Sequence, residues 1–139
     1  FDKDTNKCVC VIDLDTVMPG LALYDFGDSI RFGASTAAED ETDLDKVEMD
    51  FDYFKAYAEG FLGEAGEYFN QAEIDNLAFA SKLMTLECGM RFLTDYINGD
   101  VYFRTEYPEH NLDRARNQFK LVADMDSKMD KMEEIIKNI

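Results

Sequence analysis

The pattern that most constrains the fold is a long stretch, residues 70–99, in which apolar side chains recur at intervals of three and four. Asn70 can cap the start of a helix, Glu73 can complete a capping box, and Gly99 supplies a left-handed stop. The apolar positions cover much of the helix circumference. They are Ile74, Leu77, Ala78, Phe79, Leu83, Met84, Leu86, Met90, Phe92, Leu93, Tyr96 and Ile97. A helix that is apolar nearly all round is usually the central helix of a bundle, and the sequence therefore predicts one over residues 70–97.

Three other segments have a helical repeat. Residues 21–33 carry apolar side chains on one face, and residues 51–62 form an aromatic-rich helix with a break expected near Gly63 and Gly66. Residues 111–139 repeat apolar side chains by threes and fours to the end of the chain. Helices therefore account for most of the predicted structure.

The only predicted strand lies near the N-terminus. Residues 7–14 (KCVCVIDL) are short and β-branched, and the polar residues before them are typical of a hairpin turn. The predicted fold class is thus α+β, mostly α: an N-terminal β-hairpin or strand followed by a helical bundle. We treat 1–139 as a single partial domain, with residues 1–20 as a hairpin and loop and residues 21–139 as a helical subdomain. Because the chain opens with Phe1 in mid-hairpin, we expect it to be a fragment of something longer.

Charge and composition exclude several classes of function. Thirty acidic residues stand against fourteen Lys and Arg, a net charge of -16, and an acidic balance argues against nucleic acid or an anionic membrane as partner. Residues 34–52 are the most acidic stretch and are expected to form a solvated loop. No apolar run approaches a membrane span, and three cysteines do not make a disulfide scaffold. We therefore expect a cytoplasmic protein.

The candidate chemistry begins at the end of the predicted strand. Asp13 and Asp15 follow an apolar run, and strand alternation places their side chains on the same side. Two carboxylates so placed suit Mg²⁺, which prefers hard oxygen ligands. Equally, the two residues could simply end the strand and start a turn.

Two families use such a strand end. The segment 13–17 (DLDTV) resembles the D-x-D motif of haloacid-dehalogenase-type phosphatases, in which Asp13 would be a nucleophile and Asp15 an acid/base. Those enzymes also need a parallel sheet and later catalytic residues, and no apolar strand follows Gly20. This resemblance is kept as an alternative.

The longer segment 13–35 (DLDTVMPGLALYDFGDSIRFGAS) resembles the kinase-like phosphotransferases of the aminoglycoside phosphotransferase and choline kinase superfamily. The "I-D-x-D" strand end, the Pro-Gly loop and the following helix with an Asp occur in the same order and spacing. Within that superfamily the string is most similar to the N-acetylhexosamine 1-kinases. Residues 86–104 (LECGMRFLTDYINGDVYFR) extend the resemblance.

The resemblance implies roles for three carboxylates. Asp13 would bind the Mg²⁺ that bridges the phosphates of ATP, with Asp15 as an auxiliary ligand. Asp25 would support the backbone of the catalytic loop. The loop itself, H-x-D-x-x-x-x-N, with its base and Asn, has no counterpart here and would lie upstream of Phe1, as would the glycine-rich loop and the Lys that hold ATP. We expect no catalytic residue in this chain and no activity from it alone; His110 is interpreted as a helix-start residue.

The resemblance also suggests a sugar pocket. Arg31 and Phe32 on the first helix, and Arg91 on the central helix, are the candidate substrate-binding residues. An aromatic face suits the apolar side of a pyranose, and a guanidinium suits its hydroxyl and N-acetyl oxygens. Each has a structural alternative: Phe32 as a core residue, Arg31 and Arg91 as partners of nearby acids.

The resemblance implies that the chain is part of an ATP- and Mg²⁺-dependent kinase that phosphorylates an N-acetylhexosamine at the anomeric hydroxyl. Its partners would be the small-molecule sugar and ATP. A phosphatase of the D-x-D type and a non-catalytic acidic helical interaction module are the alternatives. Apolar surfaces left unpaired should join copies of the chain into a homo-oligomer.

Overall fold

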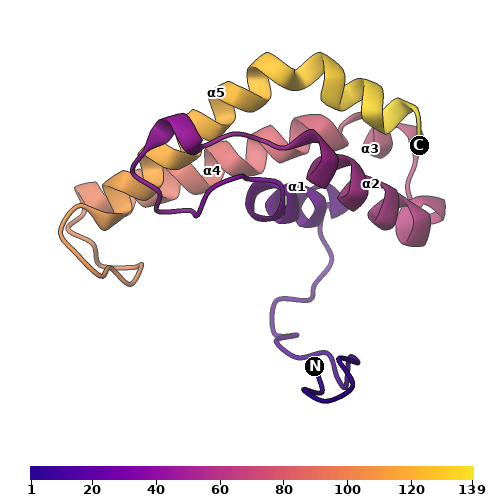
Figure 1. Ribbon diagram of the computed structural model, residues 1–139, viewed down its shortest axis with the longest axis horizontal. Coiled ribbons are helices and arrows are strands. Elements are labelled where there is room, and N and C mark those ends of the chain that lie inside the picture. Colours follow the sequence, from indigo (N-terminus) through magenta and orange to yellow (C-terminus); the bar gives the residue numbers. More distant parts are fainter.

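The computed structural model describes all 139 residues and is built of helices (Figure 1). In chain order the α-helices are α1 (Ala22–Gly33), α2 (Phe51–Ala65), α3 (Gln71–Asp75), α4 (Leu77–Ile97) and α5 (His110–Lys137); two single-turn 3₁₀ helices are η1 (Leu44–Lys46) and η2 (Gly66–Tyr68). The two longest, α4 and α5, lie side by side, and α1 packs on α4 (Figure 1). The central position of the predicted helix is thus confirmed for α4, which contacts both α1 and α5.

The main core lies where α1, α2 and α5 meet the start of α4. It is filled by Phe26, Ile30, Ala34, Val47, Met49, Phe54, Ala58, Leu77, Ala78, Leu121, Met125, Met132 and Ile136, none more than 5% exposed. Burial of each large side chain stabilises the fold by roughly 1.5–3 kcal/mol. The three methionines of α5 all contribute to this core: Met125 and Met132 are buried in it, and Met129 packs against it.

The capping of the predicted central helix is confirmed, but its continuity is not. Asn70 accepts a hydrogen bond from the Glu73 amide, and the Glu73 carboxylate accepts one from the Asn70 amide, which completes the capping box. The helix that follows ends after one turn, because Asn76 leaves the helical conformation (φ -101°, ψ 3°). The new helix, α4, then begins at Leu77. At its other end Gly99 has φ +91°, the predicted left-handed stop.

The predicted α+β class is wrong, since the chain contains no strand and no sheet. Only the turn of the expected hairpin forms: Asp2 Oδ1 accepts hydrogen bonds from the Thr5 amide at 2.8 Å and the Thr5 hydroxyl at 2.7 Å. Residues 7–14 are irregular, and Val11 and Ile12 are about three-quarters exposed (74% and 77%). The physical reason is that a β-prone segment needs a neighbouring strand to satisfy its backbone, and no other segment of this chain offers one.

The acidic stretch was expected to be a solvated loop, and it is instead attached to α5. An isolated antiparallel bridge joins Ser35 to Met49. Asn117 of α5 donates hydrogen bonds to the carbonyls of Ala38 (2.9 Å) and Glu41 (3.2 Å), and the Met49 amide donates to Asp124 at 2.7 Å. Most carboxylates of the acidic stretch still face water, with Glu39 as an exception, but the backbone of residues 35–49 is fixed.

None of the helices combines the length and the apolar character needed to cross a membrane.

Candidate binding site

A cavity of about 650 Å³ opens between α1, α4 and the start of α5. Its walls are Tyr24, Asp25, Asp28, Arg31, Glu39, Met84, Glu87, Cys88, Arg91, Phe92, Phe103, Arg104 and Arg114. The loop that joins α4 to α5 closes one side through Phe103 and Arg104. A cavity of this volume fits a small molecule of a few hundred daltons.

Arginine is concentrated in this cavity. Four of the five arginines of the chain (Arg31, Arg91, Arg104 and Arg114) line it, although they come from three separate stretches of sequence. Four carboxylates line it too: Asp25, Asp28, Glu39 and Glu87. The wall is therefore strongly polar yet close to neutral in charge, and it offers both donors and acceptors.

Arg31 is the most enclosed of these cations. Its Nε lies 2.9 Å from Asp28 Oδ1, and Nη1 donates to Glu39 Oε1. Burial acts to lower the pKa of Arg31, but the hydrogen bonds to Asp28 and Glu39 and the nearby negative charges outweigh it, so the pKa is raised. Arg31 therefore stays charged and fixes the position of Glu39 at the cavity wall.

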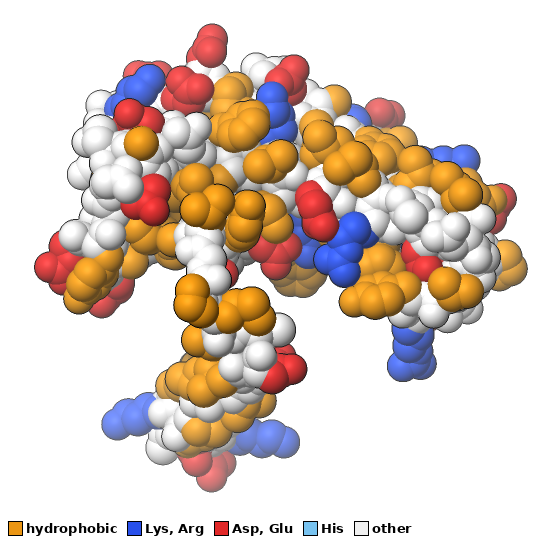
Figure 2. All heavy atoms as spheres, turned by 180° about the vertical axis from the view of Figure 1, so that it is seen from behind, with side chains coloured by type: hydrophobic (Ala, Val, Ile, Leu, Met, Phe, Trp, Pro, Cys, Tyr) orange, Lys and Arg blue, Asp and Glu red, His pale blue; other side chains and the backbone are white.

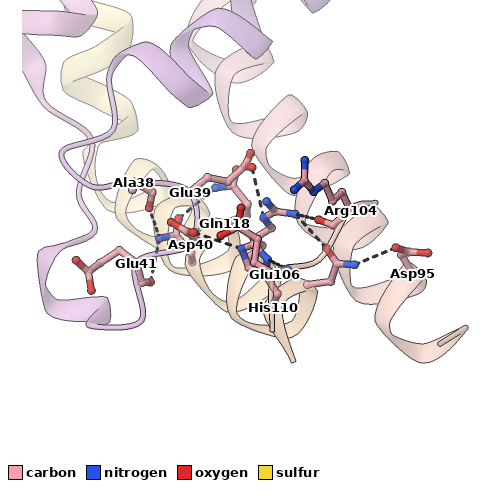
Figure 3. Close-up of polar contacts among 12 residues, drawn as sticks. Ala38, Glu39, Asp40, Glu41, Asp95, Arg104, Glu106, His110 and Gln118 are labelled. Carbon is pink, nitrogen blue, oxygen red and sulfur yellow. Dashed lines mark hydrogen bonds and ion pairs between the residues drawn. The ribbon is translucent and has the colours of Figure 1, made fainter. Parts of the chain in front are cut away.

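Glu39 connects a second arginine to this group. Its other oxygen, Oε2, lies 3.8 Å from Arg114 Nε, and Arg114 Nη1 donates to the carbonyl oxygen of Arg104 at 3.2 Å (Figure 3). The Nε atom of Arg114 is buried and makes no hydrogen bond. The acidic loop, α5 and the α4–α5 loop are thus joined at the cavity by one arginine.

The side chain of Arg91, on α4, is less constrained than those of Arg31 and Arg114. Its guanidinium lies 5.4 Å from the ring centroid of Phe103 and 5.7 Å from that of Tyr102, and its nearest carboxylate, Glu87, is 3.8 Å away. The Arg91 side chain is about half exposed (49%). It forms part of the wall of a second, smaller cavity of about 440 Å³ beside the first.

Cys88 lines the same cavity on α4. Burial is the main cause that raises the pKa of its thiol, to about 11, against a partial opposing effect of Arg31. At neutral pH the thiol is therefore protonated, and Cys88 has none of the thiolate character of a nucleophile.

The sequence-predicted residues divide into two groups. Asp25, Arg31 and Arg91 come together at the large cavity, although sixty residues separate Arg31 from Arg91. Phe32 does not join them: it is 72% exposed and borders only a very small neighbouring cavity. It is also not the core residue that its structural alternative suggested.

The two candidate metal ligands, Asp13 and Asp15, are not among the residues that line the cavity. They belong to the irregular N-terminal segment, which projects from the helices (Figure 1). Both Asp13 and Asp15 are exposed, and Asp13 has a left-handed backbone with φ +64°. No group of three or more His, Cys, Asp or Glu side chains in the chain is placed to hold a metal. Because Mg²⁺ in nucleotide sites takes one or two carboxylates and fills its shell with phosphate oxygens and water, the donor chemistry of this pair fits. The segment does not fix their geometry.

His110 has the structural role that was expected. It is the first residue of α5 and is 1% exposed. Its Nδ1 accepts a hydrogen bond from the Glu106 amide at 3.1 Å, and its Nε2 lies 3.3 Å from Asp40 Oδ2 (Figure 3). Both ring nitrogens are thus used in holding the loops before and beside α5.

Sequence reasoning missed Glu39, Arg104 and Arg114. Arg104 is the last residue of segment 86–104, which resembles the kinase family, and this position could have marked it as a candidate site residue. No sequence signal could have found Glu39, because it is one of eight acidic residues in residues 34–52 and nothing distinguishes it from the others.

No protein-family model matches the chain.

Proposed function

We propose that this chain supplies the sugar-binding part of an ATP- and Mg²⁺-dependent kinase that phosphorylates an N-acetylhexosamine at its anomeric hydroxyl. The observation that supports the proposal is that Arg31 and Arg91, two of the three candidate substrate-binding residues, line one cavity. The two arginines lie sixty residues apart in the chain, Arg31 on α1 and Arg91 on α4.

The charge of the cavity favours a neutral polyhydroxyl ligand. Arg31 and Arg114 are already paired with Glu39, which leaves Arg91 and Arg104 as the arginines with the most freedom to turn to a ligand. A strongly anionic ligand would meet the carboxylates Asp25 and Glu87, and a cationic one such as choline would meet the arginines. Hydroxyl and N-acetyl groups can use donors and acceptors together.

The aromatic side chains add a second element of sugar recognition. Tyr24, Phe92 and Phe103 all reach the cavity wall. The apolar face of a pyranose ring packs against aromatic rings while its hydroxyls point to the polar groups. Phe103, next to Arg91, provides the aromatic face that was first assigned to Phe32.

The nucleotide half of the proposal depends on Asp13 and Asp15. When bound, Mg²⁺ would offset the charge that develops on the phosphates during transfer. Asp13 and Asp15 make no side-chain hydrogen bond or ion pair within the chain, so both carboxylates are free to bind a metal-nucleotide complex. The phosphatase alternative loses its main requirement, since the 139 residues contain no parallel sheet.

The decisive experiment is a calorimetric titration of the 139-residue chain with N-acetylglucosamine and N-acetylgalactosamine, with glucose as the selectivity control. Arg91→Ala should weaken binding by about tenfold or more, because a hydrogen bond to a charged group contributes roughly 1.5–3 kcal/mol. Arg116→Ala is the matched control, since Arg116 pairs with Asp113 outside the cavity. Absence of binding to either amino sugar would remove the sugar-kinase proposal and leave the acidic interaction module.

A second experiment tests the nucleotide half. In a longer chain that includes the upstream catalytic loop, Asp13→Asn should lower kcat for sugar 1-phosphate formation by several orders of magnitude, with little change in the unfolding midpoint. Near-normal kcat would exclude Asp13 as the metal ligand. The 139-residue chain alone is expected to transfer no phosphate.

A further inference from the structure

A buried carboxylate outside the cavity organises one of its walls. Asp95, on the last turns of α4, is 5% exposed and makes no ion pair. Its Oδ1 accepts hydrogen bonds from the amides of Val101 (3.0 Å) and Tyr102 (2.8 Å), and its Oδ2 accepts one from the amide of Phe103 (2.9 Å). Three successive backbone amides of the α4–α5 loop thus converge on one side chain.

The chain reverses direction sharply to make this possible. Gly99 (φ +91°) and Asp100 (φ +56°) are both left-handed, and together they turn the backbone back toward α4. The loop then runs past Asp95 with its amides inward. This is the arrangement in which consecutive amides bind an anion, and here the anion is supplied by the protein.

Asn111 links the carboxylate to the cavity. Its Nδ2 donates to Asp95 Oδ2 (2.9 Å) and to Asp100 Oδ1 (2.8 Å), and its Oδ1 lies 3.4 Å from Arg114 Nη1. Arg114 in turn holds the carbonyl of Arg104 and faces Glu39. Figure 3 shows this line of contacts running from Asp95 at the end of α4 to Arg104 and Glu39.

Burial of apolar surface does not explain the position of the loop. Val101 and Tyr102 are 77% and 73% exposed, so their side chains contribute little apolar burial. Phe103 packs on Phe92, with ring centroids 4.7 Å apart, at the edge of a small core cluster, but this packing holds only one of the three residues. The hydrogen bonds to Asp95 are therefore the main restraint on residues 101–103.

The α4–α5 loop contributes side chains both to the cavity wall and to the surroundings of Arg91. Phe103 and Arg104 line the cavity, and Tyr102 and Phe103 face the Arg91 guanidinium. Arg91 lies four residues before Asp95 on α4, which places both side chains on one face of the helix. The carboxylate and the arginine thus hold the loop at two points one turn apart.

We propose that Asp95 is a positioning residue for the sugar site: it touches no ligand, but through three amides and Asn111 it sets where Phe103, Arg104 and Arg91 stand. The proposal rests on the proposed function, because it assigns Asp95 an effect on the affinity of that cavity. A carboxylate is required. An asparagine would turn an NH₂ group toward amide donors and leave them unpaired.

The test compares Asp95→Asn with Asp130→Asn in the 139-residue chain. Asp130 is exposed on α5 and makes no hydrogen bond or ion pair, so it matches the loss of charge without touching the loop. The probe is N-acetylglucosamine, titrated by calorimetry. Amide chemical shifts and hydrogen exchange of residues 101–103 are measured in parallel, and the unfolding midpoint gives the cost to the fold.

Asp95→Asn keeps one acceptor oxygen, so it is expected to lower the protection of residues 101–103, most of all at Phe103 if the NH₂ group takes the place of Oδ2, and to weaken binding by about tenfold or more, whereas Asp130→Asn leaves both unchanged. Asn111→Ala removes one of the four hydrogen bonds to the Asp95 carboxylate, so it should change amide protection and affinity in the same direction by a smaller amount. If Asp95→Asn does not fold, Asn111→Ala replaces it as the test variant. Released amides with an affinity within twofold of wild type would overturn the positioning role and leave the sugar site standing. If the wild-type chain binds no amino sugar, the proposed function fails, and the role of Asp95 in it fails too.

Discussion

A Cβ atom on Gly27 of α1 would lie 2.5 Å from the carbonyl oxygen of Ala80 in α4 and 2.7 Å from the Met84 side chain. The two helix backbones therefore touch at this point, and only a glycine allows it. Because Asp28 and Arg31 follow on the same helix, this close approach also sets the distance between the α1 and α4 walls of the cavity.

Gly27→Ala is expected to destabilise the fold by about 1–3 kcal/mol, since the added methyl group forces α1 away from backbone atoms that cannot yield. Gly60→Ala is the matched control. Gly60 lies within α2 with nothing within 4 Å of the added atom, so alanine there should stabilise the helix by about 0.5–1 kcal/mol. Urea unfolding followed by circular dichroism measures both. A neutral Gly27→Ala would mean that α1 and α4 are not in contact at this position.

The carboxylate of Asp95 should make stability depend on pH in acid. Burial acts to raise its pKa, but the hydrogen bonds from the amides of Phe103, Tyr102 and Val101 and from Asn111 outweigh it, so the pKa in the folded state lies below the ordinary 3.8. Its stabilisation is therefore fully present above pH 3.8 and is lost as the pH falls through the lower folded-state value.

The free-energy difference between wild type and Asp95→Asn isolates this effect, because the other acids titrate equally in both. The difference should be constant at neutral and weakly acidic pH and should shrink below the ordinary pKa of 3.8. Urea titrations at several pH values measure it. A difference that does not change with pH would show that Asp95 has the same pKa in the folded and unfolded chain.

The helices were largely predictable because each carries local signals. Asn70 and Glu73 form the capping box that their spacing predicted, and Gly99 ends α4 as expected. The break at Asn76 was not predicted, since the apolar repeat continues across it. An asparagine can leave a helix by bonding to nearby backbone, and here its Nδ2 donates to the Ala72 carbonyl at 2.7 Å.

Local sequence patterns could not predict that residues 7–14 fail to form a strand, nor the contacts that bring part of the site together. Whether residues 7–14 form a strand depends on a partner, which local sequence does not reveal. Likewise Glu39 reaches Arg31 and Arg114 only because Asn117 and Asp124 fix the acidic loop on α5. Such contacts join residues far apart in the chain, and a single sequence records them only where a resemblance carries them, as with Arg31 and Arg91.

The three cysteines should differ in reactivity. Cys8 and Cys10 are exposed in the N-terminal segment, whereas Cys88 is buried and its thiol pKa is raised to about 11. A disulfide reagent that reports thiolates at pH 8 should therefore modify two thiols rapidly and the third only after unfolding in guanidinium. The variant Cys88→Ser is the control and should lose only the slow phase. Three rapid thiols would mean that the reagent reaches Cys88 through the cavity and that the pKa of its thiol is not raised.

The N-terminal segment should be dispensable for the helical body and responsible for self-association. The hydrogen bonds of residues 1–20 stay within that segment, and none of its side chains belongs to a core cluster. Figure 2 shows it projecting from the body with hydrophobic side chains on its surface. A β-prone segment with unpaired backbone can pair with the same segment of a second copy.

The full chain should therefore form a dimer or larger species by light scattering, and a variant without residues 1–20 should be monomeric, with an unfolding midpoint changed by less than about 2 °C. A second variant, Val11→Lys with Ile12→Lys, keeps the length and removes the exposed apolar pair, so it should also be monomeric. If the full chain is a monomer, the segment does not associate. If the shortened chain still dimerises, the contact lies on the helices, where exposed Phe79 and Leu83 of α4 border an apolar groove with α5.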